Sequence, residues 1–154
     1  MKILLPILIT LSLYADMGTL IKVVDGDTLY FKTNSKKVKC RIEYIDTPES
    51  QNNKKLKKDI SKCRVSNKDM VSTGKSATRY AKSILTLNKQ YKYETKGKDR
   101  YCRYICVVDN GSQTFNEQMV VAGYATIFRY YMNKKELTYY EPLLQEAKSS
   151  RAGM

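Results

Sequence analysis

Hydrophobic and polar residues alternate over five stretches of the chain with the two-residue period of β-strands. These stretches are rich in β-branched and aromatic side chains, which favour a pleated, half-buried backbone. The predicted strands cover Thr19–Val24, Thr28–Thr33, Val38–Ile45, Gln90–Thr95 and Tyr101–Val108. Turn sequences follow the second strand at Asn34-Ser35-Lys36 and the fifth at Asp109-Asn110-Gly111.

A helical period replaces this alternation between the third and fourth strands. Apolar residues recur there at the spacing of one helix face, at Ala77, Tyr80, Ala81, Ile84 and Leu85. Ser72 and Thr73 are the expected caps at the start of this helix. A second, short helix is predicted over Asn116–Ala122 and ends at Gly123, a residue suited to the left-handed position that follows a helix.

The last helix is predicted to begin near Glu141, with Pro142 in its first turn, and to run towards Arg151. Three strands, a helix, two strands and two helices then follow one another. This order predicts an α+β fold, a five-stranded OB-type Greek-key β-barrel with three helices. The segment Ser50–Lys68 interrupts the pattern with many Lys and Asn residues, and we predict a long basic surface loop there.

The N-terminal segment has the pattern of an export signal. An early lysine precedes an apolar run from Ile3 to Leu13, and small Ala15 follows. An uncleaved anchor is the alternative, but a spanning helix needs roughly 20 apolar residues and this run ends sooner. We therefore predict a signal peptide over residues 1–15, a mature domain over residues 16–154, and a secreted or periplasmic location.

Charge and cysteine content narrow the partners and the chemistry. The formal net charge is +13, which favours a polyanionic partner such as nucleic acid or an anionic membrane, with a merely soluble basic protein as the alternative.

The four cysteines are Cys40, Cys63, Cys102 and Cys106. Cys102 and Cys106 fall in one predicted strand and are too far apart there to be bridged, so Cys63 is expected to pair with a cysteine of that strand. Three disulfide connectivities of the four cysteines, and free buried thiols, remain open. No CxxC pair occurs, which disfavours zinc.

Histidine is absent from the chain. Every mechanism that needs an imidazole base, nucleophile or metal ligand is therefore excluded. Hydrolysis would have to depend on carboxylates, Tyr, Lys, Arg or a hard metal ion. Four short motifs offer such groups, namely Val24-Asp25-Gly26-Asp27-Thr28, Arg41 to Glu49, Asp99-Arg100-Tyr101-Cys102-Arg103, and Asn116-Glu117 before Gly123.

In combination and order, these motifs resemble those of the staphylococcal nuclease family over nearly all of the mature chain. The resemblance implies an OB barrel and a Ca²⁺-dependent, sugar-nonspecific endonuclease that leaves 3′-phosphates on DNA and RNA, with single strands favoured. It implies calcium ligation by Asp27, Asp46 and the Thr47 carbonyl. It also implies catalytic roles for Arg41, Glu49 and Arg103. The substrate-binding residues it implies are Arg100, Tyr101 and Tyr131.

Physical chemistry agrees with these roles. A hard cation takes oxygen ligands, and two arginines can neutralise a phosphodiester with bidentate contacts. Glu49 would position or deprotonate the attacking water. Two departures from the family pattern stand out: Arg129 replaces an expected pocket tyrosine, and Glu43 lies two residues from Arg41, where it could hold that arginine.

Two other functions are compatible with parts of the pattern. A non-catalytic OB module would bind single strands through a basic groove, but three acids in one cleft would repel phosphate unless a metal were bound. A basic protein bound to an anionic membrane surface is supported only by the charge and the N-terminal segment. We expect a monomer without stable membrane association after signal cleavage.

Overall fold

The structure is a computed structural model that describes residues 15–51, 56–57, 60 and 66–153. Two predictions, the signal peptide over residues 1–15 and the pairing of Cys63, fall largely or wholly outside the described residues. Within the part that is described, no helix has the length and apolar composition needed to cross a membrane.

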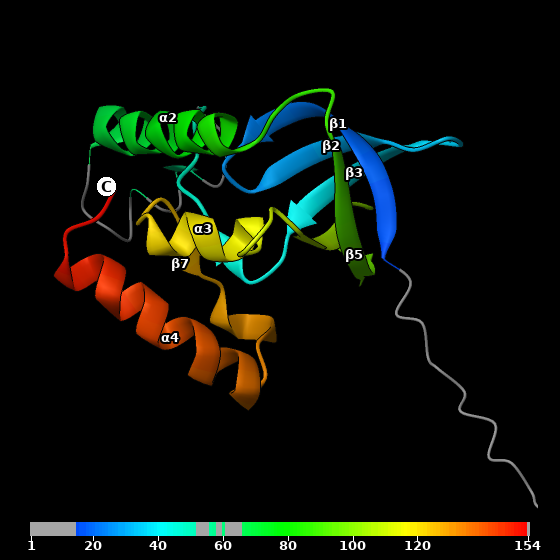
Figure 1. Cartoon of the computed structure of the whole chain (residues 1–154). Coiled ribbons are helices and arrows are strands. Elements are labelled where there is room, and N and C mark those ends of the chain that lie inside the picture. Colours follow the sequence, from blue (N-terminus) through cyan, green and yellow to red (C-terminus); the bar gives the residue numbers. More distant parts are fainter. Residues whose placement is uncertain (1–14, 52–55, 58–59, 61–65, 154) are drawn as a thin grey trace, which may run out of the picture.

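Five strands form a closed barrel in the order β1-β2-β3-β6-β5 (Figure 1). They are β1 (Asp16–Asp25), β2 (Thr28–Lys32), β3 (Lys37–Ile42), β5 (Gln90–Lys98) and β6 (Tyr104–Val108). Neighbours are antiparallel except β3 and β6, which run parallel. The predicted five-stranded OB-type barrel with three helices is confirmed.

The third predicted strand is interrupted before Ile45. β3 ends at Ile42, and Tyr44 takes a positive φ of 65° that reverses the chain. A separate two-stranded sheet then pairs β4 (Ile45–Asp46) with β7 (Thr126–Ile127). Asp46 thus lies on a different sheet from Arg41, and the bend between the two sheets brings their side chains together.

Alternating residues of the barrel strands fill its interior. The largest completely buried side chains include Leu20, Leu29, Phe31, Val38, Ile42 and Val108. A disulfide joins Cys40 of β3 to Cys106 of β6, both without exposed surface. Cys63 was predicted to pair with a cysteine of the last strand. For Cys106 this prediction is wrong, because Cys106 is bonded to Cys40. Cys102 lies in the turn before β6, exposed and outside any disulfide, because the strand begins only at Tyr104.

α2 packs along β1 and α3 packs against β6, and α4 packs on the other side of α3, so that α3 lies between α2 and α4 (Figure 1). α2 (Asn67–Ile84) is capped by Ser66 and not by Ser72 or Thr73, because the Ser66 side chain accepts a hydrogen bond from the Asp69 N–H. α3 (Phe115–Val121) begins with a capping box of Thr114 and Glu117, close to the predicted start.

α4 (Lys134–Ser149) begins well before the predicted Glu141. Asn133 and Glu136 form a capping box at its start, and Pro142 consequently lies inside the helix. A short 3₁₀ turn, η1 (Arg129–Tyr131), precedes it. The segment Ser50–Lys68 is not entirely a surface loop: Leu56 is helical and completely buried.

Candidate active site

The tight turn between β1 and β2 presents the first site residue. Gly26 forms this turn, and a Cβ there would lie 2.7 Å from the Thr47 Cγ2 atom. Only glycine therefore lets the Asp46–Thr47 segment pack against the turn. This packing buries Asp27, which is 6% exposed, at the end of the barrel.

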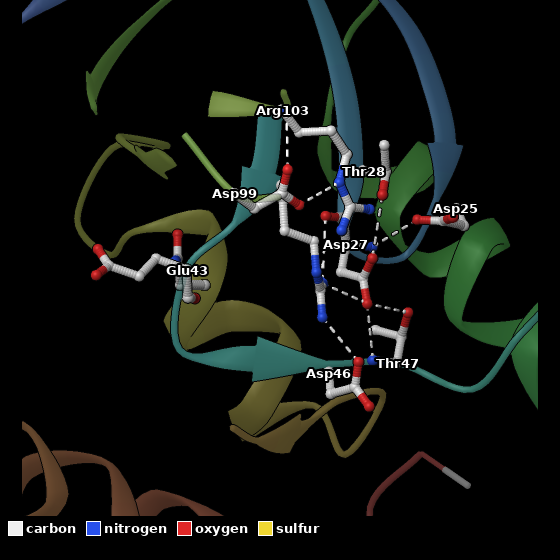
Figure 2. A network of polar contacts seen from close by, with 10 residues as sticks. Asp25, Asp27, Thr28, Glu43, Asp46, Thr47, Asp99 and Arg103 are labelled. Atoms are coloured by element: carbon white, nitrogen blue, oxygen red, sulfur yellow. Dashed lines mark hydrogen bonds and ion pairs between the residues drawn. The ribbon is translucent and has the colours of Figure 1, made fainter. Parts of the chain in front are cut away.

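The Asp27 carboxylate is the centre of a hydrogen-bond network (Figure 2). Its Oδ2 atom accepts hydrogen bonds from the Thr47 N–H and hydroxyl, both at 3.0 Å. Its Oδ1 atom accepts from the Thr28 hydroxyl at 3.2 Å. Donors from two separate chain segments therefore fix the orientation of this buried carboxylate.

Arg41 links Asp27 to Asp46. Its Nη1 lies 2.5 Å from Asp27 Oδ2, and its Nη2 lies 2.7 Å from Asp46 Oδ1. Burial alone would lower the pKa of Arg41, but the neighbouring carboxylates, Asp27 foremost, raise it above the ordinary value. The site thus holds a permanently charged guanidinium between two acids.

Asp25 is a third acid of the site, to which the sequence analysis gave no role. Its Oδ1 accepts a hydrogen bond of 3.1 Å from the Asp27 N–H. Burial, and then repulsion from Asp27, raise the pKa of Asp25 to about 6. The signal was present in the sequence, since Asp25 and Asp27 flank the turn glycine.

The turn before β6 positions the second arginine. Asp99 Oδ1 accepts hydrogen bonds of 2.9 Å from the Tyr101 and Arg103 N–H groups, and its Oδ2 lies 2.7 Å from Arg103 Nε. Although partial burial opposes it, this set of donors lowers the pKa of Asp99 below its ordinary value. Figure 2 shows the Arg103 side chain extending from Asp99 towards Asp27.

The Tyr101 ring is close to two guanidinium groups. The carbon centres of Arg100 and Arg103 are 4.9 and 5.6 Å from its ring centroid, and the ring is 65% exposed. Three residues predicted to bind substrate or phosphate, Arg100, Tyr101 and Arg103, therefore form one group. Asp99, whose carboxylate holds the turn and Arg103 in place, had no role in the sequence-based prediction.

Glu49 follows β4 in the loop that leads away from Asp46 and is partly exposed. The backbone of this loop is pressed against α2, since a Cβ on Gly74 would lie 2.3 Å from the Glu49 carbonyl oxygen. Gly74 thus sets how closely the Glu49 loop approaches the helix.

Tyr131 does not join this group among the described contacts. It lies in η1, is 77% exposed, and packs against Phe128 and Tyr130. Its neighbour Arg129 pairs with Glu141 of α4 at 2.5 Å.

The hypothesis that Glu43 holds Arg41 is wrong. β3 ends before Glu43, and its carboxylate instead lies 3.3 Å from Lys96 Nζ. The positive φ of Tyr44 belongs to the same bend and directs the chain away from the β3 face.

The donor set of the site fits a hard cation. Asp27 and Asp46 supply carboxylate oxygens that already converge on one positive group, the Arg41 guanidinium. Oxygen donors of this kind suit Ca²⁺ and need no imidazole. Among the described residues, however, no three acidic or cysteine side chains are grouped closely enough to hold an ion by themselves. Main-chain oxygens or water would have to complete the coordination.

Comparison with known proteins decides the family. A family model described as "Staphylococcal nuclease homologue" matches residues 39–154. The chain belongs to the staphylococcal nuclease family. The similarity to a thermonuclease of Staphylococcus hyicus is 30% identity and covers 85% of this chain and 69% of that protein. An uncharacterised protein of Methanocaldococcus jannaschii is 31% identical over 89% of this chain and 70% of its own length.

A micrococcal nuclease of Shigella flexneri is 27% identical and covers 96% of this chain and 79% of that protein. These three similarities each cover 85% or more of this chain, and the family model covers residues 39–154. The family assignment therefore does not depend on the site motifs alone.

Proposed function

We propose that this protein is an exported, Ca²⁺-dependent nuclease that hydrolyses phosphodiester bonds of DNA and RNA. Family membership and relatives named thermonuclease and micrococcal nuclease support nuclease activity. The observation that carries the proposal is the arrangement of Arg41 between Asp27 and Asp46, with Arg103 extending towards the same carboxylates. A phosphodiester needs both positive charge and an oxygen-rich cation site, and these groups can supply them.

Asp27, Asp46 and the Thr47 carbonyl would hold the calcium ion. When bound, the ion would act as a Lewis acid on a phosphoryl oxygen and offset its negative charge. Asp25, beside Asp27, would add to the negative potential that attracts the cation. The hydrogen bonds from Thr47 and Thr28 keep the Asp27 carboxylate oriented for this role.

The two arginines would bind the phosphate. Asp99 engages Arg103 through Nε, which leaves the two terminal nitrogens of its guanidinium to point away from Asp99. Arginine stays charged at every working pH and can offer two parallel N–H donors to phosphate oxygens. As negative charge grows on the phosphoryl oxygens in the transition state, both guanidinium groups would stabilise it.

Glu49 would orient or deprotonate a water molecule for in-line attack on phosphorus, and the 5′-oxygen would leave. The products would carry 3′-phosphates, as the family resemblance implies. Arg100 and Tyr101 would contact the terminal phosphate and nucleotide, and the exposed ring of Tyr131 would stack on a base.

Export is supported by the buried disulfide as well as by the N-terminal sequence. Cys40 and Cys106 lie in the barrel interior, and such bonds persist mainly in oxidising compartments. We propose that the mature protein is a secreted or periplasmic monomer.

Two alanine variants test the catalytic assignment. Glu49→Ala and Arg103→Ala are each expected to lower cleavage of denatured DNA in Ca²⁺ by about 100-fold or more. The matched controls are Glu146→Ala and Arg79→Ala, which remove the same charges from exposed positions on α4 and α2. Unchanged cleavage in both site variants would remove Glu49 and Arg103 from the mechanism. A non-catalytic single-strand-binding module would instead show binding without cleavage in the unmodified protein.

Cleavage in EGTA tests the metal separately. Activity is expected to disappear in EGTA and to return with added Ca²⁺. Persistent cleavage in EGTA would overturn the calcium assignment while leaving the nuclease assignment standing.

A further inference from the structure

The outward face of the β2–β3 ribbon continues from Arg41 as a row of basic residues. Burial along β3 alternates strictly, so that Lys37, Lys39 and Arg41 all point outward while Val38, Cys40 and Ile42 fill the barrel. Outward residues of one strand recur about every 6.6 Å. The row therefore extends about 13 Å from Arg41 towards the hairpin end.

β2 adds an aromatic ring to this row. Tyr30 is the cross-strand partner of Lys39, and Lys32 is the partner of Lys37. The Lys37 and Lys39 ammonium groups lie 4.4 and 5.6 Å from the Tyr30 ring centroid. The ring offsets the repulsion between the two ammonium groups and holds them together on this face.

Carboxylates do not neutralise the lysines of this row in the described part of the chain. The salt bridges there belong to Arg41, Lys96, Arg103 and Arg129, and none involves Lys32, Lys37 or Lys39. Lys96, by contrast, is paired with both Glu43 and Glu136. An unneutralised row of ammonium groups carries bound counterions, and a polyanion that displaces them gains free energy.

We infer that the outward β2–β3 face, formed by Tyr30, Lys32, Lys37 and Lys39, is a binding track for extended single-stranded nucleic acid beyond the phosphate held at Arg41. The lysines contact successive backbone phosphates, and Tyr30 provides the aromatic component that single-strand sites combine with positive charge. A single strand fits this row better than a lipid surface, because the row is narrow, follows one strand and ends at the phosphate-binding arginine. This inference rests on the proposed nuclease function for the identity of its substrate.

The test compares long and short substrates. In Lys37→Gln/Lys39→Gln, the ratio of kcat/KM for a 20-nucleotide single strand to that for a trinucleotide is expected to fall about tenfold at low salt. The salt slope of binding to the 20-mer, measured by fluorescence anisotropy in EGTA, is expected to decrease by about 1.4, or about 0.7 per lost phosphate contact.

Two matched variants separate the track from general charge. Lys82→Gln/Lys148→Gln removes the same charge from exposed positions on α2 and α4 and is expected to leave the ratio and the slope unchanged. Lys37→Arg/Lys39→Arg is expected to restore both, because arginine also binds phosphate. Equal effects of the two glutamine pairs, or an unchanged ratio in Lys37→Gln/Lys39→Gln, would overturn the track.

Two further outcomes are decisive. If no cleavage occurs at all but anisotropy still depends on Lys37 and Lys39, the nuclease proposal fails while the track stands. If the same lysines bind vesicles of equal parts phosphatidylcholine and phosphatidylglycerol more tightly than the 20-mer, the face is a membrane contact and the track is refuted.

Discussion

Residues 41–46 contribute to two ionic clusters that differ in composition and burial. In the first, Arg41 lies between Asp27 and Asp46 with only 15% of its side chain exposed. In the second, Lys96 is 47% exposed and reaches Glu43 and Glu136, and Tyr44 donates a hydrogen bond to Glu136. The first cluster gathers charge at one end of the barrel, whereas the second joins β5, the bend and α4.

The difference shows that this small domain uses one ionic cluster for the candidate active site and another to join its secondary-structure elements. Burial and repulsion from Asp27 raise the pKa of Asp25, which lies beside the first cluster. In the second cluster solvent screens Lys96, and its pairs join elements that are distant in sequence. Loss of the first cluster should therefore affect catalysis, and loss of the second should affect mainly stability.

The largest expected effect is that of Arg41→Met on activity. Removing the guanidinium takes away a phosphate-binding group and leaves two acids without their shared cation. We expect kcat/KM on denatured DNA to fall about 10²–10³-fold or more. Steady-state assays with circular dichroism as a folding check would measure it; activity close to that of the unmodified protein would remove Arg41 from the mechanism.

Gly74→Ala tests whether α2 positions the Glu49 loop. Alanine at an exposed helix site ordinarily stabilises by about 1 kcal/mol relative to glycine. Here the added methyl group would lie 2.3 Å from the Glu49 carbonyl oxygen, so we expect destabilisation of about 1–3 kcal/mol and a lower kcat. Urea denaturation measures the first effect, and Ser72→Ala on the same helix is the control. A more stable Gly74→Ala protein would show that the Glu49 loop can move away from α2 without loss of unfolding free energy.

Asp25→Asn sharpens the electrostatic side of the comparison. The pKa of Asp25 is raised from 3.8 to about 6 in the folded protein, so the folded state binds more protons than the unfolded state between these values. Stability should accordingly fall as pH rises from about 4 to about 6 and then level off, by an amount on the order of 3 kcal/mol.

The asparagine variant should lose that fall and be the more stable protein at pH 7 in EGTA. Urea titrations at half-unit pH steps would measure this. Parallel pH profiles of the two proteins would show that Asp25 does not carry the effect.

Lys96→Met is expected to have the smallest effect, a loss of about 1 kcal/mol of unfolding free energy with cleavage within about threefold of the unmodified protein. Glu43 Oε2 is buried without a hydrogen-bond partner in the described structure, and burial already raises the pKa of Glu43 despite the nearby Lys96. Glu43→Gln in the same background should recover part of the loss. A large loss of activity in Lys96→Met would show that the second cluster also contributes to catalysis.

The barrel and the heart of the candidate site could be predicted from sequence because both depend on local patterns. Alternation fixes which residues of β3 face outward, and the motif order places Asp27, Arg41 and Asp46 at strand ends. Glu43 was misassigned because a bend, stabilised by contacts with distant residues such as Asn116, ends the strand at Ile42, before Glu43. Pattern alone does not reveal such a bend.

Other errors have two origins, a local helix-start signal that was missed and tertiary contacts. Pro142 suggested a helix start, but the capping box at Asn133 and Glu136 begins α4 earlier and the helix continues through the proline. The pairing of Cys40 with Cys106 depends on β3 and β6 becoming neighbours, which is a property of barrel closure. Asp25 gained its significance only from burial, which spacing does not indicate.

That disulfide also has a consequence for the order of folding. β3 and β6 are the parallel neighbours of the barrel, and 66 positions of sequence separate Cys40 from Cys106. Closing so long a loop carries an entropic cost that delays non-local pairing. Once oxidised, the chain keeps Cys40 and Cys106 joined in its unfolded ensemble, so refolding does not have to close this loop again. The pairing of β3 with β6 is then no longer delayed by the entropy of loop closure.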